Sequence, residues 1–147
     1  MNKLFVSTLL FLLSFIVVES ESCRGNKMDN LSAKKDDTVI MGGWGGEHIE
    51  FVVNDNGAEV DYDCAHGRIN QPIVLDKNGK FNLAGTYVTE HGGPVRIDEV
   101  PNTRSAEYVG IVKDKMMILT VTLSDTKEVI GTFNLTYGSR PKVMKCR

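Results

Sequence analysis

The sequence predicts an all-β fold: a small antiparallel up-and-down barrel, or a sandwich, of about seven to eight short strands. Three features of the 147-residue chain lead to this fold class. Apolar and polar residues alternate with a period of two over several stretches, most clearly in residues 106–137. Turn-forming residues such as Asn56 and Gly57 separate these stretches. No stretch after residues 1–22 has the apolar stripe of a helix. Glycines within the strands favour the barrel, because closing a sheet needs bends.

The chain opens with the pattern of a secretory signal peptide, which we place at residues 1–22. Lys3 supplies the positive charge, the run from Leu4 to Val18 is apolar apart from Ser and Thr, and small residues precede Cys23. The apolar run is 15 residues long, and a helix needs roughly 20 to cross a bilayer. An uncleaved membrane anchor is the alternative. We therefore expect an extracytoplasmic protein that is periplasmic, anchored in the envelope or secreted.

Charge and length limit the classes of partner and the number of domains. Removal of residues 1–22 takes away one basic and two acidic side chains, which leaves 16 basic and 17 acidic and a net charge of −1. Such a chain, without a basic run, is not expected to bind nucleic acid or to be held on membranes by charge alone. Residues 23–37 are polar and aperiodic, so we expect a flexible tether. Residues 38–147 have the length of a single domain.

A β-hairpin within residues 44–67 is expected to be the centre of this domain. Its strands alternate over residues 48–54 and 58–64, and residues 54–57 supply a tight turn. Four glycines surround Trp44 just before the hairpin and are expected to bend the chain sharply. Trp44 is then a core plug at the mouth of a barrel or, as the alternative, a platform on which a ligand stacks.

Shorter elements are expected on either side of the hairpin. Residues 38–41 are an apolar run that fits a first strand, residues 67–72 are a connection, and residues 72–75 are a short strand. The longer strand 80–89 contains Gly85. A glycine inside a strand indicates a bulge or a corner of a curved sheet.

Residues 90–105 are expected to form a long loop over one end of the sheet, because they contain two prolines, two glycines and mixed charge. Loops of this length are usually functional or mobile. Residues 106–137 follow as a three-stranded antiparallel meander, and the tail 138–147 returns Cys146 toward the hairpin. The large side chains expected to face inward are Phe51, Val53, Tyr62, Phe81, Tyr87, Leu119 and Phe133.

The three cysteines have different expected roles. Export permits disulfides, and Cys64 at a strand end is expected to pair with Cys146 near the C-terminus. Two separate buried thiols are the alternative. Cys23 directly follows the signal peptide, where bacterial proteins attach a lipid, although Ser20 to Ser22 make a poor lipobox. A free thiol, or loss of Cys23 with the signal peptide, are the alternatives to lipid attachment.

Short motifs of glycine, aromatic and cysteine residues stand out across residues 42–147: Trp44-Gly45-Gly46-x-His48, Asp63-Cys64-Ala65-x-Gly67, Gly85-Thr86-Tyr87, Gly92-Gly93-Pro94-Val95, Tyr108-x-Gly110, Met117-x-Leu119-x-Val121-x-Leu123 and Lys145-Cys146. This set resembles an uncharacterised family of small exported bacterial β proteins. The resemblance implies bacterial export and a bond between the two cysteines of these motifs. It implies no activity.

A weaker resemblance concerns the start and end of the domain. Gly42-x-Trp44 near the first strand, with Arg140 after the last long strand, is similar to the lipocalin arrangement. In lipocalins a basic side chain packs over this Trp in a cation–π contact. The analogy favours a barrel but does not imply lipid transport.

The three histidines are candidate binding residues. His48, His66 and His91 each have a carboxylate close by in the sequence, and three imidazoles with a carboxylate suit zinc. The hairpin should bring His48 and His66 to one end of the barrel, and the long loop allows His91 to reach it. However, their spacing matches no compact metal motif. Three independent surface histidines are the alternative, and we assign no metal or other cofactor.

Two common catalytic signatures are missing from the chain: the Gly-x-Ser-x-Gly motif and a phosphate-binding glycine loop. We therefore expect a non-enzymatic envelope protein that binds a small apolar ligand or a partner protein. A structural or inhibitory protein that acts by contact is the alternative, and a metal-dependent envelope enzyme is a third hypothesis. The residues that we single out for binding are Trp44, His48, His66, Tyr87, His91 and Arg140.

Overall fold

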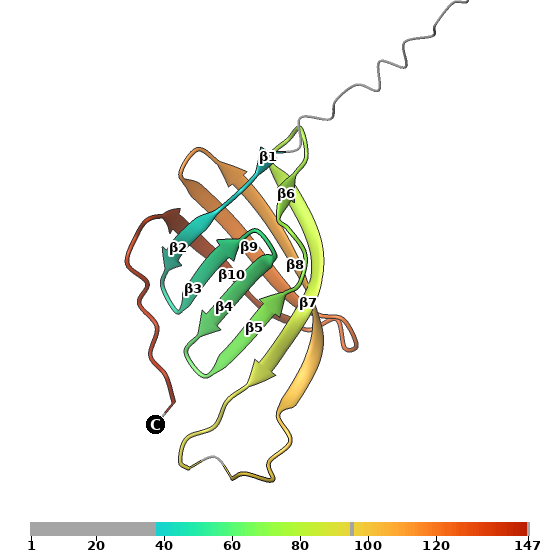
Figure 1. Cartoon of the computed structure of the whole chain (residues 1–147), viewed down its shortest axis with the longest axis vertical. Coiled ribbons are helices and arrows are strands. Elements are labelled where there is room, and N and C mark those ends of the chain that lie inside the picture. Colours follow the sequence, from blue (N-terminus) through green and yellow to red (C-terminus); the bar gives the residue numbers. More distant parts are fainter. Residues whose placement is uncertain (1–37, 95, 147) are drawn as a thin grey trace, which may run out of the picture. The chain divides into compact units, whose positions relative to one another are not determined.

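The computed structural model describes residues 38–94 and 96–146, all of which belong to one compact unit spanning Lys34–Arg147 (Figure 1). The expected signal peptide (1–22), the candidate lipid attachment at Cys23 and the expected tether (23–37) lie outside the described residues. No described residue belongs to a helix long and apolar enough to cross a bilayer.

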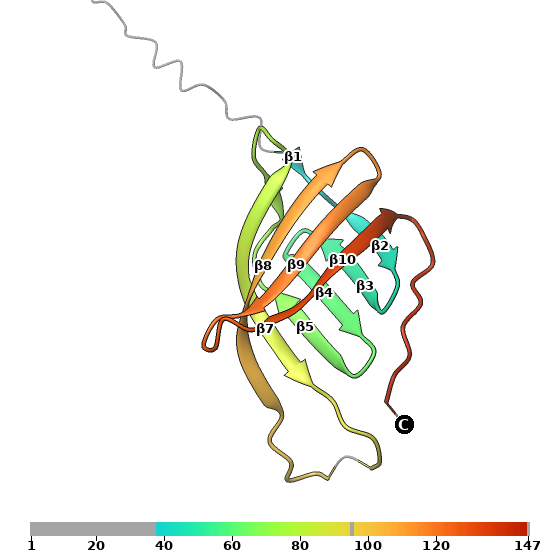
Figure 2. The same cartoon turned by 180° about the vertical axis from the view of Figure 1, so that it is seen from behind.

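The domain is a closed antiparallel barrel of eight strands, in which each strand follows its neighbour in the chain and the last strand pairs with the first (Figures 1 and 2). This confirms the up-and-down barrel. The strands of the barrel are β2 (Gly42–Gly46), β3 (Ile49–Asn54), β4 (Gly57–Tyr62), β5 (Ala65–Ile69), β7 (Lys80–Thr89), β8 (Asn102–Lys113), β9 (Met116–Leu123) and β10 (Val129–Tyr137).

The remaining two strands form a small separate sheet. β1 (Thr38–Val39) pairs with β6 (Val74–Leu75) in antiparallel register. The first apolar run is therefore a strand, as expected, but it is shorter and stands outside the barrel. The expected strand 72–75 is likewise reduced to β6.

The central hairpin and the final meander are confirmed. β3 and β4 pair from Ile49 opposite Tyr62 to Asn54 opposite Gly57, so that two residues make the turn. Gly57, the first residue after the turn, has a φ of 146°, a backbone conformation that favours glycine. β8, β9 and β10 pair in sequence order. A register irregularity between Val129 and Gly131 bends β10.

Three predicted connections are strands instead. The glycine-rich segment around Trp44 is β2, rather than a sharp bend, and pairs with both β3 and β10. Half of the predicted connection 67–72, residues 67–69, belongs to β5, which pairs with β4 and β7. The predicted loop 90–105 is shorter, because β8 begins at Asn102, opposite Thr89. In each case cross-strand pairing outweighs the weak strand propensity of glycine and polar residues.

Gly85 is neither a bulge nor a shift of register, because β7 pairs continuously with β8 through it. A larger residue at Gly85 is excluded both by the carbonyl oxygen of Arg68, 2.5 Å from where a Cβ would lie, and by the ring of Tyr108. A Cβ at Gly85 would come within 2.8 Å of Cε2 of Tyr108, and a Cβ at Gly67 would overlap the Tyr108 hydroxyl. These two glycines therefore make room for a large ring at the centre of the barrel.

The interior is filled by side chains. The buried cluster includes Trp44, Phe51, Tyr62, Phe81 and Tyr108 together with aliphatic residues from β3, β4, β5, β8, β9 and β10. Leu83 on β7 and Phe133 on β10 are partly buried and pack against this cluster. The Tyr108 hydroxyl donates to the carbonyl oxygen of Thr86 at 2.7 Å. All seven side chains expected to face inward are buried or pack against this cluster: Phe51, Val53, Tyr62, Phe81, Tyr87, Leu119 and Phe133.

Candidate functional site

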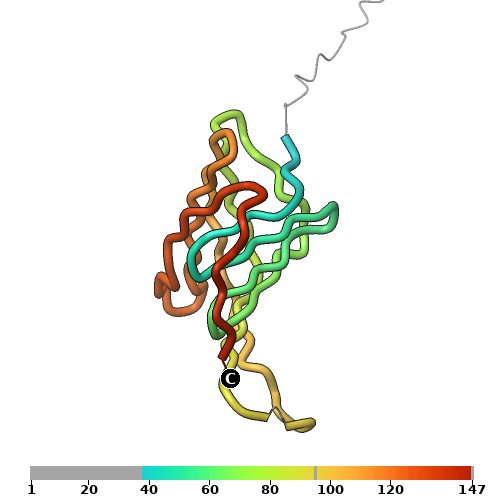
Figure 3. Tube along the Cα trace, turned by 90° about the vertical axis from the view of Figure 1, so that its left-hand side faces the viewer, coloured from blue at the N-terminus to red at the C-terminus, as the bar shows by residue number. Residues whose placement is uncertain are grey.

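The C-terminal tail, residues 138–146, lies along the outside of the barrel, and we call it the strap (Figure 3). At its start the amide of Gly138 donates to the carbonyl oxygen of Gly43 at 2.8 Å. Further along, the amide of Lys142 donates to the carbonyl oxygen of Gly46 at 3.0 Å. Backbone bonds to β2 therefore fix the first half of the strap.

Asp63 fixes the second half. One oxygen of its carboxylate accepts the backbone amide of Met144 at 2.9 Å, and the other lies 2.6 Å from Nδ1 of His48. The amide of His48 in turn donates to the carbonyl oxygen of Lys142 at 2.9 Å. The bond from Met144, followed by the contact with His48, lowers the pKa of Asp63. The carboxylate therefore joins the hairpin to the strap in its ionised form.

The disulfide between Cys64 and Cys146 ends the strap and confirms the predicted pair. The two Cα atoms are 5.1 Å apart and the cysteines are 82 residues apart in the sequence. Both cysteines are exposed. A cross-link over a loop of this length is worth roughly 4 kcal/mol in chain-entropy models. Such a bond is compatible with an extracytoplasmic location.

Lys145 links the strap to two barrel strands. Its Nζ lies 2.6 Å from a carboxylate oxygen of Asp61 on β4, 3.2 Å from the carbonyl oxygen of Ala65, and 3.4 Å from a carboxylate oxygen of Glu90 at the end of β7. Partial burial opposes the charge of Lys145, but the bonds to Asp61 and then Glu90 outweigh it and raise its pKa. The strap is thus held by ionic contacts as well as by the disulfide.

Each of the three histidines contacts a different carboxylate at the end of the barrel where the disulfide lies. His48 meets Asp63, as described above. Nδ1 of His66 lies 2.7 Å from a carboxylate oxygen of Glu90, and Nε2 of His91 lies 2.5 Å from a carboxylate oxygen of Glu99. Within residues 38–94 and 96–146, no group of three or more His, Cys, Asp and Glu side chains is arranged to hold a metal ion.

A hollow of about 520 Å³ lies between the strap and the long loop, whose described residues are 90–94 and 96–101. The structure brings two of the predicted binding residues, His66 and His91, into the wall of this hollow, whereas His48 is not part of the wall. The other side chains that define its character are Val88, Glu90, Glu99, Val100, Pro101 and Cys146. The hollow therefore combines carboxylates and imidazoles with an apolar side.

The long loop carries the two most exposed large apolar side chains of the described chain. Ile97 is fully exposed and Val100 is 87% exposed, whereas the exposed apolar residues of the strands do not exceed 61%. Figures 1 and 2 show that the loop extends past the ends of β4 and β5. Contiguous exposed apolar surface marks contact sites, and Ile97 and Val100 are the least covered large apolar side chains among the described residues.

The other predicted binding residues lie away from this end. Trp44 is buried, and its ring meets Tyr137 edge to face at a centroid distance of 5.3 Å. Its Nε1 has no hydrogen-bond partner among the described atoms. Arg140 is exposed on the strap, and no cation–π contact joins it to Trp44 in the described part of the chain. Tyr87 is half-buried and packs on Tyr62 at 5.4 Å.

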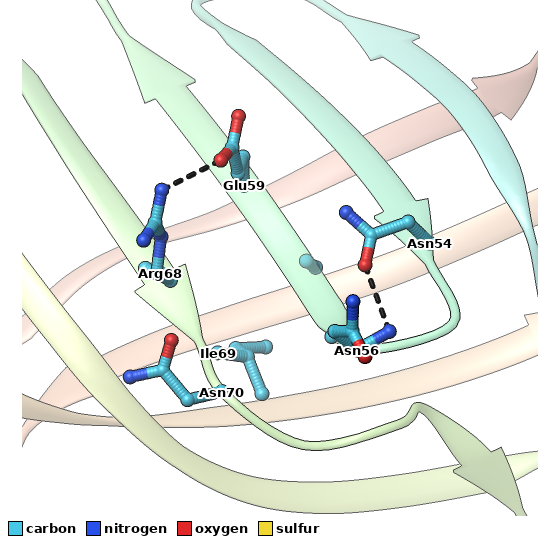
Figure 4. Close-up of a pocket in the computed structure, with 8 residues that line it drawn as sticks. Asn54, Asn56, Glu59, Arg68, Ile69 and Asn70 are labelled. Atoms are coloured by element: carbon cyan, nitrogen blue, oxygen red, sulfur yellow. Dashed lines mark hydrogen bonds and ion pairs between the residues drawn. The ribbon is translucent and has the colours of Figure 1, made fainter.

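A second hollow lies on the outer face at the other end of the central hairpin (Figure 4). It has a volume of about 200 Å³, and its wall includes Asn54, Asn56 and Asn70. An ion pair of 2.7 Å between Arg68 and Glu59 closes one side. None of the inward-facing aromatic residues lines either hollow, although the core residues Ala58 and Ile69 form part of the wall of the second one.

The protein is therefore an eight-stranded up-and-down barrel with a C-terminal strap fixed by a disulfide and one protruding loop. The chain matches no protein-family model, no curated protein and no solved structure.

Sequence reasoning missed several residues of this site. Glu99 was not singled out. Asp63 was noted only as a carboxylate close to the histidines, and Lys145 only as the neighbour of Cys146, although the alternation 59–63 places acids on one face of the hairpin. Ile97 and Val100 were missed because isolated apolar residues in a loop are common. The lack of any strand period around these two apolar residues is the signal that could have marked them as exposed.

Proposed function

We propose that the protein is an exported, non-enzymatic β-barrel that binds a partner protein of the bacterial envelope through the long loop. The observation that supports this is the exposure of Ile97 and Val100 on a loop whose first residue, Glu90, bonds to the carbonyl oxygen of Cys64 and to Lys145 of the strap. A rigid support lowers the entropy that is lost when a loop binds. The two apolar side chains are the contacts expected to enter a cleft of the partner.

The filled interior argues for a protein partner rather than a small apolar ligand inside the barrel. A ligand there would have to displace side chains such as Phe51 and Tyr108, which are fully buried. Loss of such packing costs on the order of 3–5 kcal/mol for one aromatic residue. The small-ligand alternative would therefore need a large rearrangement that binding at the loop does not require.

The histidine pairs argue against a metal-dependent enzyme. His48, His66 and His91 each bond to a different carboxylate, at distances between 2.5 and 2.7 Å. A zinc site needs three or four ligands around one point, each about 2 Å from the metal. These separate pairs are better suited to hold the strap and the loop in place.

Export and anchoring belong to the same proposal. The N-terminal pattern of residues 1–22 and the disulfide both fit a protein that leaves the cytoplasm. A lipid on Cys23 would hold the barrel at a membrane through the segment 23–37. The loop would then reach partners within the envelope.

Site-specific photocrosslinking tests the contact. A photoreactive amino acid replaces Ile97 in one variant and Ile118 in another, because Ile118 is an exposed apolar residue of β9 outside the loop. In the intact envelope of the producing cell, we expect the Ile97 probe to give one discrete protein adduct. Adding Val100→Ser should reduce this adduct, and excess unlabelled protein should compete it away. The proposal is wrong if the Ile97 probe gives no adduct, or if the Ile118 probe gives the same one.

A further inference from the structure

His91 differs from the other two histidines because both nitrogens of its ring face hydrogen-bond acceptors. Its Nδ1 lies 2.9 Å from the carbonyl oxygen of Gly92, and its Nε2 lies 2.5 Å from a carboxylate oxygen of Glu99. His48 and His66 each use one ring nitrogen, Nδ1, in the bonds that the structure shows.

The hydrogen-bond acceptors that face the ring of His91 determine which of its two nitrogens carry a hydrogen. A carbonyl oxygen can only accept, so Nδ1 must carry a hydrogen. An ionised carboxylate can also only accept, so Nε2 must carry a second one. A neutral ring would require Glu99 itself to be protonated, and the ordinary pKa of that group is about 4.5. While Glu99 is ionised, the geometry is therefore that of an imidazolium.

The surroundings of His91 support the charged form. The bond to Gly92, together with Glu99, raises the pKa of His91, and the bond from His91 lowers the pKa of Glu99. The amide of Arg96 also donates to Glu99, at 3.4 Å. The charged and titratable groups around the pair come from the loop, from the ends of β5 and β7 and from the strap: Arg96, Asp98, Glu90, His66 and Lys145.

The contact between His91 and Glu99 links two parts of the loop that are separated in the sequence. His91 and Gly92 lie in the limb of the loop that leaves β7, whereas Glu99 lies in the limb that enters β8. The contact therefore joins the two limbs at the base of the segment that carries Ile97. The His91 ring is exposed and the Glu99 carboxylate is partly exposed, so water and protons reach both groups.

We infer that His91 and Glu99 form a proton-dependent clasp, which holds the loop in one conformation while His91 is charged and releases it when His91 is neutral. This inference rests on the proposed function, because the clasp regulates the binding of the partner protein by the loop. A loop that is ordered before binding loses less entropy on contact. Binding should therefore be tighter while the clasp is closed.

The pKa shifts of His91 and Glu99 define the pH range in which the clasp is closed. Because the pKa of His91 is raised, its contribution is complete below about 6.5 and is lost as the pH rises through the higher value in the folded protein. Because the pKa of Glu99 is lowered, its contribution is complete above about 4.5 and is lost as the pH falls through the lower value in the folded protein. The clasp is fully closed between these two limits.

Nuclear magnetic resonance tests the clasp without any partner. The nitrogen shifts of the imidazole rings report the protons on Nδ1 and Nε2 through a pH titration. We expect the midpoint of His91 to fall in Glu99→Gln, because the anionic acceptor is removed. An unchanged midpoint in this variant would overturn the clasp.

Backbone relaxation of residues 96–100 then tests the mechanical consequence. We expect greater amplitude of motion at about pH 8 than at about pH 5.5 in the native chain, and no such change in His91→Gln, which cannot titrate. His66→Gln is the control and should retain the change. Equal pH dependence in His91→Gln and in the native chain would contradict the inference. A clasp without an Ile97 adduct would refute only the proposed function, and an adduct without a clasp would refute only this inference.

Discussion

The carbonyl oxygen of Ser139 lies directly over Gly45, so that a Cβ at Gly45 would overlap it. The same Cβ would also come within 2.8 Å of the backbone nitrogen of Pro141. The strap therefore crosses β2 at a distance that only glycine permits. The glycines around Trp44 suggest a bend when seen in the sequence. In the structure Gly45 instead leaves room for the backbone of the C-terminal tail to lie against β2.

Gly45→Ala should destabilise the protein because the new methyl group displaces the strap. Overpacking of this kind costs roughly 1–3 kcal/mol in the free energy of unfolding. The matched control is Gly43→Ala in the same strand, where a Cβ would meet no atom within 4 Å. Its effect should stay within about 0.5 kcal/mol. Urea unfolding of both variants measures the difference, and equal destabilisation would show that the strap does not rest on Gly45.

Removing the disulfide should weaken the whole barrel, because the bond joins the end of the chain to the hairpin. The double variant Cys64→Ser, Cys146→Ser should lose about 2–5 kcal/mol in the free energy of unfolding. The native protein with and without reductant provides the same comparison without a substitution. A midpoint of urea unfolding that reductant leaves unchanged would contradict a stabilising role.

Asp63→Asn should lower the thermal midpoint at neutral pH, because it weakens the bond from Met144 and the contact with His48. Since the pKa of Asp63 is lowered, its contribution is present above about 3.8 and is lost as the pH falls through the lower value in the folded protein. The difference between variant and native protein should therefore shrink in acid. Asp55→Asn, in the exposed turn of the hairpin, is the control. A difference that persists at about pH 2 would refute this linkage.

Tyr108→Phe should destabilise the core by about 1 kcal/mol, because it removes the bond to the carbonyl oxygen of Thr86. Burial raises the pKa of Tyr108 to about 12, and burial also raises the pKa of Tyr62. A raised pKa means that stability is lost as the pH rises toward this range. Ultraviolet absorbance of tyrosinate, followed together with circular dichroism, should therefore show both residues ionising only as the barrel unfolds. Ionisation of all the tyrosines near pH 10 in the folded protein would contradict this.

The regular strands could be predicted from the sequence because alternation reports burial directly. The hairpin from Ile49 to Tyr62 and the meander from β8 to β10 have the predicted pairing, and Phe51 and Leu119 face inward as expected. β2 and β5 could not be predicted in this way. Gly45 and Gly46 face a neighbouring backbone and Gly67 faces the Tyr108 hydroxyl, and these neighbours are known only once the register is fixed.

The site was less predictable than the fold, because its contacts join residues far apart in the chain. The hairpin does bring the histidine region to one end of the barrel, as expected, and the sequence also predicted the disulfide. The choice of Asp63 for His48, and of Glu90 for His66, depends on how strands and turns meet in space. Proximity in the sequence suggested several carboxylates and could not select among them.

The most direct test of the central claim is the native mass of the protein taken from the envelope of the cell that produces it. The account predicts a complex with a second protein, which Ile97→Ser with Val100→Ser abolishes while the barrel remains folded. A small molecule that leaves on activation would contradict the claim and point to a carried ligand. A complex that survives both substitutions would also contradict it, because the contact would then lie elsewhere on the barrel.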